Sequence, residues 1–123
     1  MTCSCSVGYN EHHISHSAFD LGNHDKIEVP CKTLKTIMHD NGHKTIDIMK
    51  MDIEGFEYEV IDSIIKFGIK PQQLLIEFHH FFSNLNNKMT EDYIDKLIAF
   101  GYDLVHISNS FCEYSFVLKE VNI

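Results

Sequence analysis

The sequence contains no arginine and no tryptophan, and only two of its 123 residues are proline. All ten basic residues are lysine, against 18 acidic residues, so the formal net charge is −8. Proteins that bind nucleic acids need a basic surface, and they use arginine for bidentate contacts with phosphates and guanine. The composition therefore excludes a nucleic acid as the partner.

Long apolar runs and targeting signals are also missing. No stretch approaches the roughly 20 apolar residues of a membrane-spanning helix. The first ten residues have neither the basic nor the apolar region of a secretory signal. The four cysteines are too few and too scattered to form a disulfide framework. We therefore expect a soluble protein of the reducing cytoplasm, with no membrane partner.

The chain divides into two parts by composition. Residues 1–26 are polar, rich in serine, histidine and asparagine, and show no hydrophobic period, so we expect an irregular N-terminal segment. Residues 27–123 carry the patterns of one domain with a single core. The patterns predict strands over Ile27–Cys31, Thr45–Asp52, Gln73–His79, Tyr102–Ser108 and Glu113–Lys119, and helices over Thr33–Asn41, Phe56–Phe67 and Thr90–Gly101.

This order of elements predicts an α/β fold. Alternation of helices and strands is typical of a parallel sheet with right-handed crossovers. Only Asn109 to Cys112 separate the last two strands, which forces an antiparallel hairpin. The hairpin is expected to add one antiparallel edge to the parallel sheet.

The most informative stretch is Thr45–Glu57, T-I-D-I-M-K-M-D-I-E-G-F-E. It is typical of a buried strand that ends in acidic residues and turns at Gly55 into an amphipathic helix. Open parallel sheets bind ligands outside the carboxyl ends of their strands. Asp52 and Glu54 are therefore expected at the edge of the sheet where such a fold carries out its chemistry.

A family resemblance rests on this stretch and on its continuation. The run I-D-I-M-K-M-D-I-E-G-F-E-Y-E-V-I, followed after one helix by L-L-I-E-F-H-H, resembles the FkbM-type methyltransferase domain over about Ile27–Leu118. The resemblance implies a Rossmann-like fold that uses S-adenosylmethionine to methylate a hydroxyl of a sugar or natural product. Such folds have seven strands with the last antiparallel, and the strands here would be the fourth to the seventh.

The chain departs from that family in its glycines. The cofactor loop of such enzymes is glycine-rich, so that the backbone can approach the ligand closely. Here no two of the six glycines lie within twelve residues of each other, and no G-x-G occurs. We therefore expect the C-terminal half of a methyltransferase domain, truncated to four or five strands and three helices, without its own cofactor loop. No cofactor-binding residue is assigned.

The candidate catalytic residues are Asp52, Glu54 and His79. Methyl transfer requires alignment of the acceptor oxygen and removal of its proton, and these three side chains could supply the base. The alternative is structural: the two acids favour the start of a helix, and His79 forms a hydrogen bond at a strand end. Glu57 is expected to be a solvated acid of the first helical turn.

The sequence allows two metal interpretations, and neither leads us to predict a metal site. Asp52, Glu54 and His79 have oxygen and imidazole ligands for a divalent ion, but no local spacing demands one. The N-terminal cysteines and histidines do not match the common zinc spacings. These N-terminal residues are Cys3, Cys5, His12, His13 and His16.

A second hypothesis is a non-enzymatic or split-domain module. Without the first three strands, Thr45–Asp52 would be an unpaired apolar edge, which is prone to associate with another chain. The partner would be a second copy or the missing N-terminal half. The methyltransferase hypothesis instead implies a small-molecule or glycan acceptor.

Overall fold

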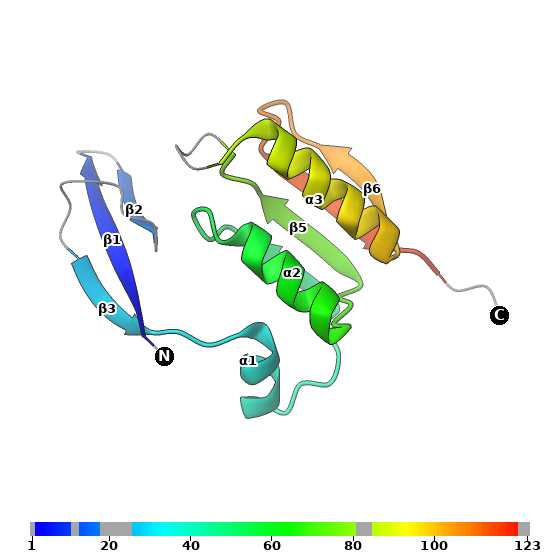
Figure 1. Ribbon diagram of the computed structural model, residues 1–123, viewed down its shortest axis with the longest axis horizontal. Helices are drawn as coiled ribbons and strands as arrows, with labels where there is room; N and C mark the ends of the chain where they lie inside the picture. The colour runs from blue at the N-terminus through cyan, green and yellow to red at the C-terminus, as the bar shows by residue number, and fades with distance from the viewer. Residues whose placement is uncertain (1, 11–12, 18–25, 81–84, 121–123) are drawn as a thin grey trace.

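The computed structural model describes residues 2–10, 13–17, 26–80 and 85–120, and only the backbone of those before residue 30. Its main unit is a four-stranded sheet in the order β4-β5-β7-β6 (Figure 1). Helices α2 and α3 lie across one face of this sheet, and the shorter α1 precedes it. The strands are β4 (Ile48–Met51), β5 (Gln73–Glu77), β6 (Tyr102–Ile107) and β7 (Glu113–Leu118), and the helices are α1 (Leu34–Asp40), α2 (Glu57–Phe67) and α3 (Asn87–Phe100).

The predicted α/β class with three helices and a C-terminal antiparallel hairpin is confirmed. Strands β4 and β5 are parallel, while β7 is antiparallel to both β5 and β6. The expectation that the hairpin adds an antiparallel edge is wrong, because β7 inserts between β5 and β6. The sheet is therefore mixed, and β6 is its outer strand.

The core lies between the sheet and helices α2 and α3. On the sheet side, Leu74 pairs with Phe116 and Ile76 with Tyr114, which sets these four side chains on the same face. Helix α2 adds Tyr58, Ile61 and Ile64 at helical spacing, and Leu97 comes from α3. All these side chains are buried: Tyr58, Ile61, Ile64, Leu74, Ile76, Leu97, Tyr114 and Phe116.

The helix ends follow the local sequence. Gly68 and Gly101 close α2 and α3 with positive φ angles, which glycine adopts without steric cost. The Thr33 hydroxyl caps α1 as predicted, by accepting from the Thr36 amide. The expectation that Thr90 caps α3 is wrong, because the helix begins one turn earlier and Asn86 is its cap. Thr90 is instead buried inside the helix.

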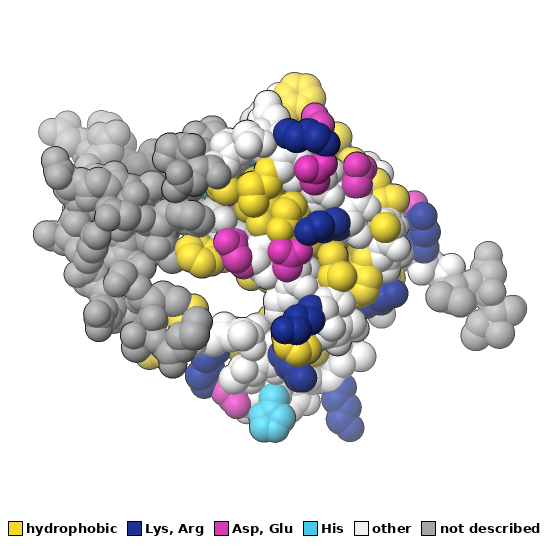
Figure 2. All heavy atoms as spheres, viewed as in Figure 1, with side chains coloured by type: hydrophobic (Ala, Val, Ile, Leu, Met, Phe, Trp, Pro, Cys, Tyr) yellow, Lys and Arg dark blue, Asp and Glu magenta, His cyan; other side chains and the backbone are white. Residues whose placement is uncertain are grey.

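The outer surface of α2 and α3 carries a mixture of side chains. Hydrophobic, lysine and acidic groups alternate over this face (Figure 2). Lys96, for example, pairs with Asp62 of the neighbouring helix at 3.0 Å. This mixture is typical of helix faces that contact water. None of the described helices is long and apolar enough to cross a membrane.

The other face of the sheet has no helix over it within the described ranges. Ile48, Leu75 and Val117 lie on this face, because they alternate with the core residues along their strands. Ile48 is 60% exposed and Val117 is 39% exposed. The outer edge of β4 also has no neighbouring strand among the described residues.

The expectation of an irregular segment over residues 1–26 is wrong in its described parts. Strands β1 (Thr2–Asn10), β2 (His13–Ser17) and β3 (Lys26–Pro30) form an antiparallel sheet in the order β2-β1-β3 (Figure 1). Only the last of these strands was predicted. The ladder hydrogen bonds are made by backbone groups, so polar side chains without a clear period can still form strands.

The strand expected over Thr45–Asp52 is shorter in the structure. β4 has only four residues and Asp52 lies beyond the last pair, although the carbonyl oxygens of Ile46 and Asp47 still accept hydrogen bonds from the amides of Gln72 and Gln73. Cys31 is disulfide-bonded, and one such bond is not the framework that the cysteine count excluded. Cys112 is a free cysteine.

Tyr102 provides a test of the core. Its buried hydroxyl donates to the carbonyl oxygen of Pro71, and burial raises its pKa to about 12. The folded state therefore holds this proton more tightly than the unfolded state, whose tyrosine pKa is about 10. The resulting stabilisation is complete below pH about 10 and is lost as the pH rises through about 12.

We expect Tyr102→Phe to lower the free energy of unfolding by about 1 kcal/mol near neutral pH, because the Pro71 carbonyl loses its donor. The variant should also show a shallower loss of stability above pH 10. Urea denaturation from pH 7 to 11 measures both effects. An unchanged alkaline slope would contradict the assignment to Tyr102.

Candidate functional site

The turn that joins β4 to α2 has an unusual backbone. Glu54 has a φ of +54° and Gly55 a φ of +106°. Glycine adopts such angles freely, but for a glutamate the left-handed region costs roughly 1 kcal/mol. Backbone strain of this kind clusters at functional sites and needs surrounding contacts to hold it.

Glu57 supplies those contacts from the first turn of α2. Its side chain is fully buried, and its carboxylate accepts hydrogen bonds from the backbone amides of Ile53 and Gly55 at 3.0–3.3 Å. The prediction that Glu57 is solvated is therefore wrong. The carboxylate turns back over its own helix start, where backbone N–H groups have no partner within the helix.

His79 lies two residues beyond the end of β5 and is only 3% exposed. Its Nδ1 is 2.7 Å from Oε1 of Glu57. Because an ionised carboxylate only accepts hydrogen bonds, Nδ1 carries the hydrogen and donates it. This bond fixes the orientation of the ring and leaves Nε2 facing the other side.

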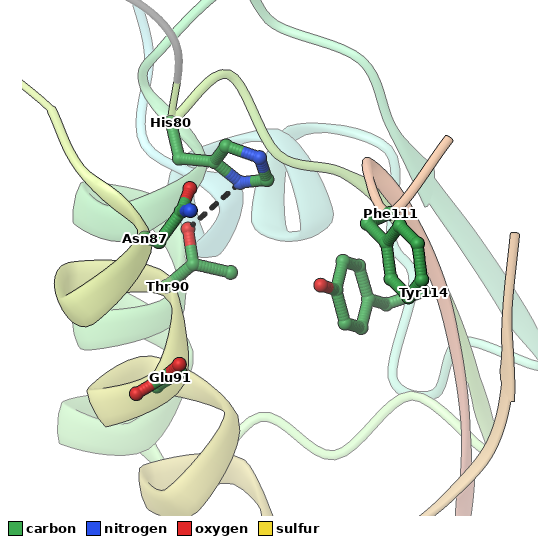
Figure 3. A pocket seen from close by; sticks show the side chains of 6 residues that line it. All are labelled: His80, Asn87, Thr90, Glu91, Phe111 and Tyr114. Atoms are coloured by element: carbon green, nitrogen blue, oxygen red, sulfur yellow. Dashed lines mark hydrogen bonds between the residues drawn. The ribbon is translucent and has the colours of Figure 1, made fainter. Parts of the chain in front are cut away.

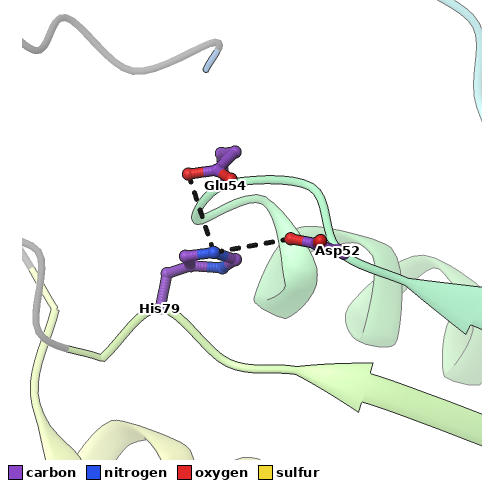
Figure 4. Close-up of side chains that lie close together, drawn as sticks. All are labelled: Asp52, Glu54 and His79. Carbon is purple, nitrogen blue, oxygen red and sulfur yellow. Dashed lines mark ion pairs between the residues drawn. The ribbon is translucent and has the colours of Figure 1, made fainter. Parts of the chain in front are cut away.

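Asp52 and Glu54 lie on that other side. The distance from His79 Nε2 to Asp52 Oδ1 is 3.6 Å, and the distance to Glu54 Oε2 is also 3.6 Å (Figure 4). One ligand atom from each of the three residues lies within 4.8 Å of the others. The three residues proposed from the sequence thus form one cluster, because β4 and β5 are parallel neighbours that end at the same edge. We call it the Asp52–Glu54–His79 cluster.

The charges around the cluster shift two pKa values. Burial alone would lower the pKa of His79, but the hydrogen bond to Glu57 and the charges of Glu57, Glu54 and Glu77 outweigh it and raise the pKa. Burial and the nearby charge of Asp52 raise the pKa of Glu77. The local field therefore favours a positive charge at the cluster.

A separate polar pocket lies beside the cluster. His80, the residue after His79, lines a cavity of about 210 Å³ together with Thr90, Glu91 and the aromatic side chains of Phe111 and Tyr114 (Figure 3). The hydroxyl of Thr90 lies 3.3 Å from His80 Nδ1 and 2.8 Å from the buried hydroxyl of Tyr58. His79 and His80 therefore make separate contacts.

Phe111 has an exceptional position at the rim of this pocket. It is 66% exposed and has a φ of +58°, in the turn between β6 and β7. Residues in strained backbone conformations cluster at functional sites, so Phe111 is a candidate for contact with a ligand. No pattern in the sequence marked Phe111, because its importance depends on a turn conformation.

Other charged and candidate metal-binding side chains of the sequence lie away from the cluster or outside the described residues. Lys50 is exposed and lines, with Glu77, His106 and Glu113, a hollow on the face of the sheet without helices. Its ammonium group can contact water there, because no described helix covers that face. The N-terminal zinc hypothesis concerns side chains that lie outside the described residues.

Comparison with protein families agrees with this geometry. A family model described as the methyltransferase FkbM domain matches residues 4–104. The chain belongs to this family. The matched region begins before Ile27, which is where the sequence resemblance begins. It ends at residue 104, so β7 is not part of the matched region. Comparisons with curated proteins and with solved structures found no significant match.

Membership in the FkbM family makes the chain a methyltransferase by family. It also gives the Asp52–Glu54–His79 cluster a chemical context, because the D-I-E-G segment that carries two of its residues lies within the matched region. Glu57, like Phe111, is a site residue that sequence reasoning missed. Its spacing from Glu54 was visible, but its burial depends on the fold of the turn.

We expect Glu57→Gln to lower the free energy of unfolding by about 3 kcal/mol. Three N–H groups donate hydrogen bonds to the carboxylate. The side-chain NH2 of glutamine would face at least one of them, and that buried hydrogen bond would be lost. Urea denaturation measures the change. Glu59→Gln is the matched control, because Glu59 is exposed in the same helix and should change stability by less than about 0.5 kcal/mol. Equal stability of the two variants would refute the structural role of Glu57.

Proposed function

We propose that the chain carries the acceptor side of an O-methyltransferase site that uses S-adenosylmethionine and acts on a hydroxyl of a sugar or natural product. The observation that carries the proposal is the Asp52–Glu54–His79 cluster at the carboxyl edge of β4 and β5. This edge is where open α/β sheets bind their ligands, and the family supports the methyl-transfer class.

The cluster suits the chemistry of an acceptor hydroxyl. S-adenosylmethionine supplies an electrophilic methyl group when it is bound. The acceptor oxygen must be aligned with that group and must lose its proton. The carboxylates of Asp52 and Glu54 lie on the solvent side of His79, with side chains 45% and 25% exposed. An acceptor hydroxyl can donate to the more exposed carboxylate, that of Asp52, and pass its proton to it, while Glu54, His79 and Glu57 hold the geometry.

The pocket lined by His80, Phe111 and Tyr114 suits the rest of the acceptor. An exposed aromatic ring packs against the apolar face of a sugar or polyketide ring, and the histidine, threonine and acidic groups around it can bind hydroxyls. His79 belongs to the cluster and His80 lines the pocket, and the two residues are adjacent in the chain after β5. One acceptor could therefore reach both.

The chain's residues do not fit S-adenosylmethionine in the usual manner. No G-x-G occurs in the sequence, and the described sheet has no strand beyond β4 to carry a cofactor loop. We propose that further strands beside β4 would complete a Rossmann-like sheet and hold the donor. No residue of this chain is assigned to the donor.

The two halves of this proposal can be measured separately on the chain. Calorimetric titration with S-adenosylmethionine should show no binding. A panel of methyl glycosides and other polyols should shift the NMR signals of the His80 and Phe111 rings. Tight binding of S-adenosylmethionine would refute the missing donor side. A panel that shifts none of these signals would refute the acceptor pocket.

In an assembly that transfers methyl groups, we expect Asp52→Asn to lower kcat by roughly 10²- to 10⁴-fold, because the hydroxyl proton loses its acceptor. Asp47→Asn is the control, since Asp47 is an exposed acid at the opposite end of β4. Full activity of Asp52→Asn would return Asp52 to a structural role.

A second candidate function is a split-domain or non-enzymatic module. The bare outer edge of β4 and the exposed Ile48 and Val117 on the uncovered face favour it. Exposed strand edges associate with other strands, and apolar side chains beside the edge add to the attraction. The partner would be a second copy of the chain or a segment that supplies the missing strands.

Light scattering coupled to gel filtration tests self-association. If two copies pair through β4, the mass should rise with concentration, and Ile48→Lys should abolish the rise. Ile98→Lys is the control, because Ile98 is 40% exposed on α3, away from the edge. A monomer at every concentration would exclude pairing of two copies.

The cytoplasmic location stays a prediction from the cysteine pattern. The disulfide at Cys31 argues against it, because disulfides persist mainly in oxidising compartments.

A further inference from the structure

We infer that the Asp52–Glu54–His79 cluster is a binding site for a divalent cation, of the class of Mn²⁺, with Glu57 as the group that orients its histidine. Nothing in the family match assigns a metal to these residues. The binding of the ion stands on the geometry alone, and its use in catalysis rests on the proposed function.

The first argument is the convergence of electron-pair donors. Nδ1 of His79 donates its hydrogen to Glu57, so the lone pair of a neutral ring is at Nε2. That lone pair faces a carboxylate oxygen of Asp52 and another of Glu54, each at 3.6 Å. These three groups need a positive charge between them. A proton on Nε2 supplies it in the two ion pairs, and a divalent cation can take the place of that proton.

The second argument is size. Nitrogen and carboxylate ligands lie about 2.0–2.2 Å from a bound transition metal, so adjacent ligands are roughly 3.0–3.5 Å apart. The two distances of 3.6 Å from His79 need to shorten by a few tenths of an ångström, and the two carboxylates, whose ligand atoms lie within 4.8 Å of each other, need to move closer together. Asp52, which is half-exposed, can make this adjustment by rotating its side chain.

The third argument is the support behind the ligand. Histidines that bind metals usually donate their other ring N–H to a carboxylate, which fixes the ring and raises its basicity. Glu57 does this for His79, and two backbone amides in turn hold the Glu57 carboxylate. A buried carboxylate that is itself oriented provides a rigid base for a site whose other ligands reach solvent.

The ligand set indicates which ion would bind. Carboxylates suit Mg²⁺, Ca²⁺ and Mn²⁺, whereas imidazole suits transition metals. A set of two carboxylates and one imidazole therefore favours Mn²⁺ over Ca²⁺. Three protein ligands leave further positions open on the solvent side of Asp52 and Glu54. In the proposed reaction, an acceptor hydroxyl bound at an open position would become more acidic, as water does on a metal.

The test is titration of the full chain, freed of metals with EDTA, with MnCl₂ at constant pH. We expect saturable binding of one ion by calorimetry. Paramagnetic broadening in NMR spectra should be strongest for the His79 ring. Absence of saturable binding, or broadening that spares His79 while affecting other residues, would overturn the inference.

Variants locate the ion without relying on activity. Asp52→Asn and Glu54→Gly should each weaken Mn²⁺ binding at least tenfold. Glu54→Gly is informative because it also removes the cost of a positive φ at a glutamate, so the melting temperature should not fall. Asp47→Asn and Glu59→Gln remove the same charge from exposed positions elsewhere and should bind Mn²⁺ like the parent chain. Equal affinity in all four variants would refute the site.

The outcomes also separate this inference from the proposed function. A chain that binds Mn²⁺ at His79 but never binds hydroxyl acceptors would support the cation site and refute the acceptor role. Acceptor binding with no measurable Mn²⁺ binding would support the acceptor role and refute the cation site.

Discussion

The hydrogen bonds of the buried Glu57 carboxylate hold the candidate site together. The two oxygens of this carboxylate accept hydrogen bonds from the backbone amides of the turn after β4 and from the histidine that follows β5. These contacts tie the ends of two neighbouring parallel strands to the start of α2. They also hold Glu54 in a backbone conformation that it would not adopt by itself. Without the carboxylate, neither the turn nor the imidazole ring would have a fixed position.

This arrangement separates a structural carboxylate from the two carboxylates that we propose take part in the reaction. Glu57 is buried and bound on both oxygens, so its charge is used for orientation. Asp52 and Glu54 come from the same short segment, yet they reach the solvent side of His79. The burial of each acid, rather than its chemical type, decides its role. His79 lies between the buried carboxylate and the two solvent-facing carboxylates and contacts all three.

The two faces of the sheet differ in how they are covered. Helices α2 and α3 cover one face and enclose the aromatic and aliphatic core, while the face with Ile48 and Val117 has no cover in the described part of the chain. The antiparallel β7 between β5 and β6 brings the hairpin turn and Phe111 next to His80. The pocket proposed for the acceptor therefore depends on the strand order as much as on any single residue.

The sequence alone determined the α/β class, the positions of most helices and strands, and the identity of Asp52, Glu54 and His79 as the candidate site. These features depend on local periodicity and on chain order, which a sequence shows directly. Only the tertiary structure decided the burial of Glu57, the position of β7 inside the sheet, the earlier start of α3 and the strands formed by the polar N-terminal segment. Each of these depends on which distant backbone or side-chain group becomes the partner, and local pattern does not contain that information.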